Sequence, residues 1–209
     1  MQPAGVEFFF DCSSPWTWLG FHNMQRLAAE LRVGVDYRPV LLGAIFNAVN
    51  PGVYEFRESG SVAKKRYIEK DLQDWARETG LTIHFPNKVF PLNSVKVMRA
   101  CVVMQEQGRL VHFAGAAFHA YWTDQIDVGT PVGLTEVCRR VGTDAAALLT
   151  AIETPAAKAK LRANTDELIA RGGFGTPTIF VGDTDMYFGN DRLGLVRAAL
   201  LGQPAGMTT

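Results

Sequence analysis

The pattern of apolar and polar positions predicts strands at both ends of the chain and helices between them. Near the N-terminus, the apolar run at 6–11 (VEFFFD) is typical of a short buried strand. Apolar residues recur every three or four positions over 15–32, which predicts a helix, and 33–40 (VGVDYRPV) predicts a second strand. A strand, a helix and a strand in such quick succession predict a parallel β-α-β unit.

The long middle of the chain carries helical patterns. The clearest is an amphipathic stripe formed by Leu110, Phe113, Ala114, Ala117, Phe118 and Tyr121. Threonine caps and terminal glycines bound several of the segments. The predicted helices lie at 61–80, 93–108, 109–124, 130–142, 143–153 and 154–173.

Strand patterns return near the C-terminus. Residues 176–183 and 185–190 flank a GDTD turn and predict a hairpin. A closing helix is predicted over 190–202, and a mobile tail over 203–209.

This order of elements predicts an α/β fold in which a large all-helical insertion interrupts one sheet-based domain. The predicted domain consists of 1–42 and 172–202, and the helical insertion spans 43–171.

The composition of the chain argues against nucleic-acid binding, membrane insertion and metal binding. The 209 residues include 21 basic and 21 acidic side chains, so no net field favours nucleic acid or an anionic membrane. No apolar run is long enough for a membrane span or a secretory signal. The three cysteines form no CxxC pair, and the four histidines form no metal motif, so we expect a cytoplasmic protein without a metal site.

The segment FFFDCSSPWTWLGF (8–21) carries the first candidate chemistry. A serine hydroxyl at Ser14, beside the positive end of a helix dipole, is suited to donate a hydrogen bond to an anion. The same spacing also fits an ordinary cap serine followed by Pro15, so the residues alone leave both interpretations open. Cys12 has no resolving partner nearby and is predicted to be a small buried side chain.

The element order, with Thr176-Pro177 just before the third strand, resembles a thioredoxin fold of the DsbA-like branch. FDCSSPWTWLGF and GGFGTPTIFVGDTDMYFGNDRLGLV (172–196) resemble the end motifs of kappa-class glutathione transferases and 2-hydroxychromene-2-carboxylate isomerases. The resemblance spans essentially the whole chain. Ser14 and Thr17 stand where thioredoxin-fold redox proteins carry C-x-x-C, which excludes ordinary thiol-disulfide exchange.

The resemblance implies glutathione as a cofactor. It assigns Ser14 the catalytic role of lowering the pKa of the glutathione thiol, and it implies a cis Thr176–Pro177 bond beside the cysteinyl part. The cofactor-binding residues that it implies are Asn50, Lys64, Thr176, Pro177, Gly189, Asn190 and Asp191. Asn190 is also expected to cap the last helix.

The implied reaction is cis-trans isomerisation of a 2-hydroxychromene-2-carboxylate by reversible thiolate addition, as in aromatic catabolism. Arg57 and Phe46 are predicted to contact this small aromatic, or more generally electrophilic, substrate. Two alternatives stay open: a kappa-class-like glutathione transferase or peroxidase, and a non-catalytic glutathione-binding module. The resemblance also implies a homodimer.

Overall fold

The computed structural model describes residues 5–202; the predicted tail at 203–209 lies outside them. The strands are β1 (Val6–Phe10), β2 (Val35–Pro39), β3 (Thr178–Val181) and β4 (Asp185–Phe188). The helices are α1 (Pro15–Leu31), α2 (Leu42–Val49), α3 (Gly52–Ser59), α4 (Val62–Thr79), α5 (Val95–Glu106), α6 (Leu110–Trp122), α7 (Pro131–Val141), α8 (Ala145–Ala151), α9 (Pro155–Ala170) and α10 (Leu193–Leu200). A short 3₁₀ turn, η1 (Asn190–Arg192), precedes α10.

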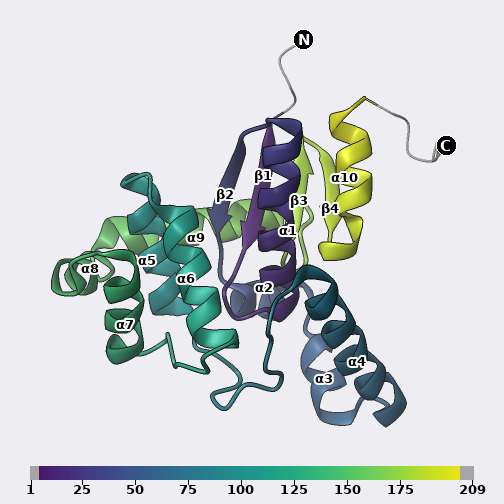
Figure 1. The fold of residues 1–209 in the computed structure, drawn as a ribbon, viewed down its shortest axis with the longest axis horizontal. Coiled ribbons are helices and arrows are strands. Elements are labelled where there is room, and N and C mark those ends of the chain that lie inside the picture. Colours follow the sequence, from purple (N-terminus) through teal and green to yellow (C-terminus); the bar gives the residue numbers. More distant parts are fainter. Residues whose placement is uncertain (1–4, 203–209) are drawn as a thin grey trace.

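The four strands form one mixed sheet in the order β2-β1-β3-β4 (Figure 1). β1 runs parallel to β2 and antiparallel to β3, and β3 pairs with β4 in an antiparallel hairpin. The predicted β-α-β unit and the C-terminal hairpin are therefore confirmed.

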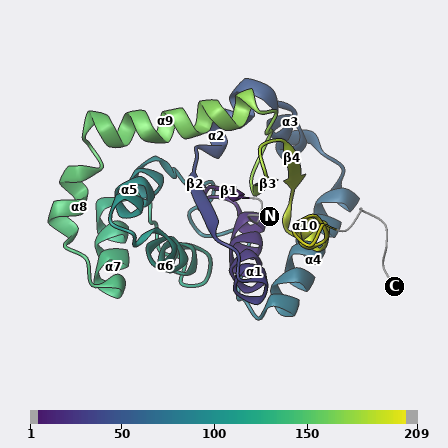
Figure 2. The ribbon, with the colours of Figure 1, turned by 90° about the horizontal axis from the view of Figure 1, so that it is seen from above.

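Helices cover both faces of the sheet, which explains why β1 is apolar without alternation. Phe8 and Phe10 belong to the core on the α1 face, whereas Phe9 belongs to a smaller core with Phe180 and Leu168. Viewed from above, α1 and α10 lie on one side of the strands, and α2 and α9 lie on the other (Figure 2).

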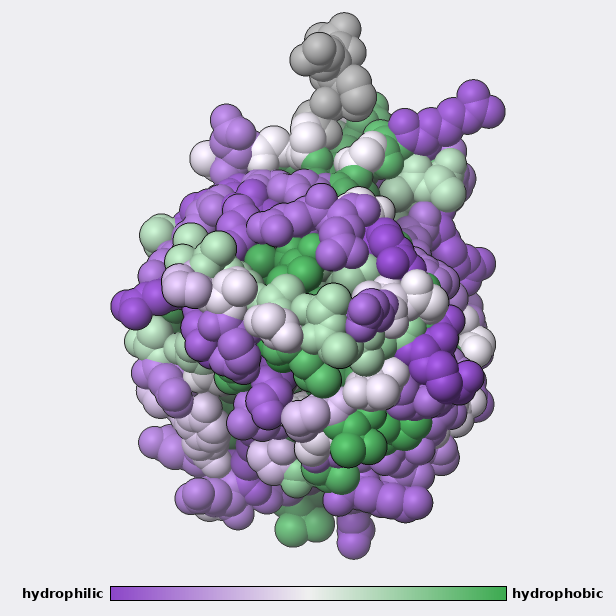
Figure 3. All heavy atoms as spheres, turned by 90° about the vertical axis from the view of Figure 1, so that its left-hand side faces the viewer, coloured by the Kyte–Doolittle hydropathy of each residue, from purple (hydrophilic) through white to green (hydrophobic). Residues whose placement is uncertain are grey.

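The remaining helices form two groups beside the sheet. Helices α5 to α8 make a lobe next to β2, and α3 and α4 project on the opposite side (Figure 1). The predicted stripe on α6 is wholly buried in this lobe. The outer face of the lobe is largely hydrophilic, with apolar side chains in separate patches (Figure 3). Helix α9 links the lobe to the sheet, because its last turns reach β2 and α2.

The structure adds two helices that the periodicity does not individually predict, α2 and α3. It also shortens the last predicted helix, which begins at Leu193 after η1. None of the described helices is long and apolar enough to cross a membrane.

The small core under α9 is expected to be essential for stability. Leu168 is fully buried there, so Leu168→Ala should lower the free energy of unfolding by about 2–5 kcal/mol through lost burial and the resulting cavity. Urea denaturation followed by circular dichroism measures this loss. Val132→Ala is the control: Val132 is 81% exposed, and its truncation should change stability by no more than about 0.5 kcal/mol. Equal effects of the two substitutions would contradict the assignment of this core.

Candidate functional site

The turn between β1 and α1 places Ser14 at the N-terminus of α1. Ser14 is the N-cap residue and Pro15 takes the first helical position. The Thr17 N–H donates to Ser14 Oγ at 3.1 Å. This bond uses a lone pair of the hydroxyl and leaves its proton available, since no acceptor for that proton occurs within residues 5–202. The capping and the functional interpretations of Ser14 are therefore compatible.

The buried carboxylate of Asp11 holds this turn in place. Its Oδ1 accepts from the Ser13 N–H, and its Oδ2 accepts from the Leu42 N–H and the Ser94 hydroxyl, each at 2.8 Å. Burial raises the pKa of Asp11, and the hydrogen bonds from these three partners oppose that rise. Asp11 thus ties the turn to the first residue of α2 and to the residue before α5.

Cys12 is buried, as predicted. Burial, together with the neighbouring Cys101, raises the pKa of the Cys12 thiol well above its usual range. A thiol in that environment is not ionised at neutral pH, so Cys12 does not supply a nucleophile.

A cavity of about 490 Å³ opens in front of Ser14. Most of its wall is apolar and comes from α2, α3, α4 and the loop before α5. The wall includes Pro15, Trp16, Leu42, Phe46, Val53, Phe56, Ile68, Phe85, Pro86, Phe90 and Phe188, and its polar members include Ser13, Ser14, Asn50, Arg57, Lys65, Glu69 and Thr176.

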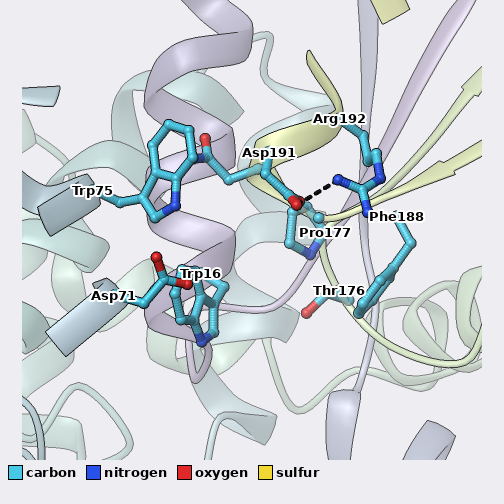
Figure 4. Close-up of a pocket in the computed structure, with 10 residues that line it drawn as sticks. Trp16, Asp71, Trp75, Thr176, Pro177, Phe188, Asp191 and Arg192 are labelled. Atoms are coloured by element: carbon cyan, nitrogen blue, oxygen red, sulfur yellow. Dashed lines mark hydrogen bonds and ion pairs between the residues drawn. The ribbon is translucent and has the colours of Figure 1, made fainter. Parts of the chain in front are cut away.

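A second cavity of about 330 Å³ shares Trp16, Thr176 and Phe188 with the first and is therefore contiguous with it. Its remaining wall consists of Asp71, Trp75, Pro177, Gly189, Asn190, Asp191 and Arg192. In Figure 4, the α4 side chains of Asp71 and Trp75 face the segment of Asp191 and Arg192 across this cavity.

Thr176 lies where the two cavities join. Its peptide bond to Pro177 is cis, as the resemblance implied. Its side-chain Oγ1 accepts a hydrogen bond from Thr17 Oγ1 at 2.8 Å. Within residues 5–202, no hydrogen bond engages the N–H or C=O of Thr176, so both backbone groups can bind an extended peptide-like ligand.

Asn190 does not cap the last helix, contrary to the sequence prediction. Gly189, with φ of 100°, precedes η1 without a side-chain cap. The Asn190 side chain instead turns toward α1, where its Oδ1 accepts from Asn23 Nδ2 at 2.9 Å. Asn190 is 5% exposed, and its Nδ2 has no partner in the described part of the chain. Tertiary packing against α1 has overridden the local capping preference.

Two further predicted residues lie at the same cavity. Gly189 forms part of its wall, where its positive φ favours glycine. The Asp191 carboxylate accepts a hydrogen bond from Arg192 Nη1 at 2.5 Å and forms an ion pair with it.

Of the two predicted cofactor contacts in the α2–α4 region, Asn50 and Lys64, only Asn50 lines the large cavity. Asn50 reaches the large cavity, and its Nδ2 donates to the Phe174 carbonyl at 3.2 Å. Lys64 is exposed, with Nζ 5.0 Å from the ring centre of Phe56, and the lysine in the cavity wall is Lys65. Neighbouring residues on a helix point about 100° apart, so a one-residue uncertainty in register decides which lysine reaches a site.

Arg57 and Phe46, the predicted substrate contacts, lie together. The Arg57 guanidinium carbon is 5.8, 5.9 and 5.5 Å from the ring centres of Phe46, Tyr54 and Phe90. No carboxylate of the described residues pairs with this guanidinium. Arg57 and Phe46 also line a third cavity, of about 410 Å³, which adjoins the large one.

Sequence reasoning missed several residues of the site. Trp16, Asp71, Trp75 and Phe188 line its walls, and Thr17 and Asn23 contact it through side-chain hydrogen bonds. Asp71 and Trp75 are four residues apart on α4, which is a detectable signal that they share a helix face.

Residues 5–201 match the family model of the DSBA-like thioredoxin domain. The chain belongs to this family. The match covers both halves of the sheet and every described helix, so the sheet and the helical lobe are parts of one family fold.

Relatives within the family are named enzymes. The chain is 28% identical to the 2-hydroxychromene-2-carboxylate isomerase of Pseudomonas sp. (strain C18), over 95% of this chain and 91% of the relative. It is also 28% identical to glutathione S-transferase kappa 1 of Homo sapiens, over 96% and 92% of the two chains.

Solved structures of related proteins share the fold of this chain. The structure of a 2-hydroxychromene-2-carboxylate isomerase superposes with a TM-score of 0.81 at 25% identity, covering 95% of each chain. Pseudomonas aeruginosa DsbA superposes with a TM-score of 0.59 at 14% identity, covering 97% of this chain and 85% of DsbA, and shares the fold.

The raised pKa of Asp11 predicts a specific dependence of stability on pH. The folded state binds the Asp11 proton more tightly than the unfolded state, so the Asp11 contribution to the unfolding free energy falls as the pH rises above about 3.9 and through the raised pKa. Asp11→Asn should remove this component. The amide group also cannot accept at all the positions that the carboxylate fills, so stability at pH 7 should fall by about 1–3 kcal/mol.

Chemical denaturation of both proteins between pH 4 and pH 8 provides the comparison. Asp166→Asn is the matched control, because the Asp166 side chain is 64% exposed. If Asp11→Asn and the wild type show the same pH profile, the coupling of Asp11 to folding is not as described.

Proposed function

We propose that this protein is a glutathione-dependent isomerase of the 2-hydroxychromene-2-carboxylate type. The observation that carries the proposal is the Ser14 hydroxyl, which accepts a hydrogen bond from the Thr17 N–H and faces a largely apolar cavity with its own proton free to donate. Relatives over nearly the full length carry this activity in their names.

The residues around Ser14 suit the parts of glutathione. Ser14 would hold the sulfur, and the free N–H and C=O of Thr176 would hold the peptide-like middle. At the far end, the unpartnered and buried Asn190 Nδ2 suits a carboxylate, and the carboxylate of Asp191 suits an ammonium group. A buried donor without a partner is costly unless a ligand satisfies it, which supports a polar ligand at this point.

Ser14 would act on the protonation state of the sulfur. A free thiol has a pKa of about 8.5, so little of it is ionised at neutral pH. A hydrogen bond from Ser14, together with the positive end of α1, stabilises the thiolate and lowers that pKa. When bound, glutathione would supply a nucleophilic thiolate that adds reversibly to a conjugated double bond and so permits rotation.

The substrate would occupy the large cavity. Phe46, Phe56 and Phe90 in its wall suit an aromatic ring. Arg57, a cation without a carboxylate partner among the described residues, suits the carboxylate of such a substrate. These contacts support an aromatic acid as the substrate.

A kappa-class-like glutathione transferase is the second candidate. The names of the human and Caenorhabditis elegans relatives favour it, and both reactions need the same activated sulfur. The difference is stoichiometric: an isomerase turns over without net loss of free thiol, whereas a transferase consumes one thiol per substrate converted. Thiol quantification during turnover therefore distinguishes the two.

Ser14→Ala tests the proposal directly. Thiolate absorbance near 240 nm, followed against pH, gives the pKa of glutathione bound to each protein. The wild type should lower that pKa by about one unit or more, and Ser14→Ala should return it close to the free value. Ser13→Ala removes the neighbouring hydroxyl but keeps the Ser13 N–H bond to Asp11, and should behave like the wild type. A wild type that leaves the thiol pKa unchanged would exclude thiolate activation.

Arg57→Gln tests the class of substrate. Loss of a charged hydrogen-bond donor should raise KM for an aromatic carboxylate about tenfold and leave KM for a neutral electrophile nearly unchanged. Steady-state kinetics with the two kinds of substrate make the comparison. Arg66→Gln on the exposed face of α4 is the control for loss of positive charge. Equal changes for the charged and the neutral substrate would show that Arg57 does not bind the carboxylate.

A further inference from the structure

One stripe of α1 contacts the opposite half of the site at three successive points. Thr17, Gly20 and Asn23 follow Ser14 at intervals of three residues and share this side of the helix. Their partners belong to a segment more than 150 residues later in the chain. The contacts are Thr17 to Thr176, Gly20 to Pro177 and Asn23 to Asn190.

Thr17 is the point of this stripe nearest to the proposed chemistry. Its N–H donates to Ser14 Oγ at 3.1 Å, and its own hydroxyl donates to Thr176 Oγ1 at 2.8 Å. Thr17 is fully buried and Thr176 is 5% exposed, so this hydroxyl pair is shielded from water. Thr17 therefore connects Ser14, the proposed hydrogen-bond donor to the sulfur, with Thr176, whose backbone would bind the peptide-like part of glutathione.

Gly20 and Asn23 continue the close contact between this stripe of α1 and the C-terminal segment. A Cβ at Gly20 would lie 2.8 Å from Pro177 Cγ, so only glycine permits this approach of the helix. The Asn23 amide orients the Asn190 side chain and leaves Asn190 Nδ2 unpartnered. Along α1, the packing thus sets the relative positions of all three parts of the proposed glutathione site.

We propose that Thr17 is a positioning residue that fixes the Ser14 hydroxyl relative to the backbone of Thr176 through its side-chain hydrogen bond. This inference rests on the proposed function. A hydrogen bond to a thiolate weakens steeply when its geometry is lost, so the Thr17–Thr176 bond controls how strongly Ser14 lowers the pKa of the bound thiol. Ser14 donates to the sulfur, and Thr17 acts through the placement of Ser14 and Thr176.

Thr17→Val tests the inference, because valine keeps the shape and the backbone N–H but lacks the hydroxyl. The thiolate fraction of bound glutathione at pH 7 should fall by about threefold or more, measured by absorbance near 240 nm at saturating glutathione. Thr17→Ser is the matched control: serine keeps the hydroxyl, so the thiolate fraction should stay close to that of the wild type.

Thr176→Val removes the same bond from its other end and keeps the backbone of residue 176. If the bond is shared as described, each single substitution and the double substitution should lower the thiolate fraction by the same factor. Thermal unfolding, measured in parallel, identifies a variant that does not fold, and the other single substitution then provides the test.

The outcomes separate the two proposals. If the wild type lowers the thiol pKa and Ser14→Ala does not, but Thr17→Val matches the wild type, the positioning role of Thr17 is overturned while the proposed function stands. If Thr17→Val and Thr17→Ser lose the effect equally, the hydroxyl is not responsible and the inference is also overturned. If the wild type does not lower the thiol pKa, the proposed function fails and the inference fails with it.

Discussion

The hydrogen bonds of the Asp11 carboxylate hold the centre of this molecule together. Asp11 directly follows β1, one of the two inner strands of the sheet, and is fully buried. Its carboxylate accepts hydrogen bonds from the turn before α1, from the start of α2 and from Ser94 before α5. Removing a carboxylate from water is costly, and these donors offset part of that cost, since burial still leaves the pKa of Asp11 raised. The position of Ser14, three residues later, follows from this arrangement.

The packing of α1 against the C-terminal half of the sheet completes the site. Ser14 belongs to the first β-α-β unit, whereas Thr176 lies just before the β3–β4 hairpin and Asn190 lies in the turn that follows it. The antiparallel pairing of β1 with β3 places the segment before β3 close to the start of α1. The Thr17, Gly20 and Asn23 contacts then fix the distance between the two halves. Small changes in the packing of α1 should therefore disturb the site, although Ser14 is the only residue of α1 and its cap that is proposed to donate to the sulfur.

The helical region has two roles. Its α5–α8 lobe shares one continuous core with β1 and α1, while α2, α3 and α4 supply much of the walls of the cavities. Polar groups at the ends of β1, α1 and β4 meet aromatic rings from α2, α3 and the loop before α5 at these cavities. Relatives that match nearly the whole chain are named for two different reactions, an isomerisation and a glutathione transfer.

Hydrophobic periodicity, terminal glycines and the Ser14-Pro15 start of α1 are local properties, so the amino-acid pattern alone predicted the four strands and eight of the ten described helices, with α2 and α3 missed. Together with its end motifs, it also pointed to Ser14, Thr176 and Asn190. Helix packing, in contrast, turns Asn190 to Asn23 rather than leaving it to cap a helix, and it brings Thr17 to Thr176. It also brings Lys65 rather than Lys64 to the cavity. No local pattern predicts these contacts, because they join segments that are far apart in the chain and depend on how whole helices pack.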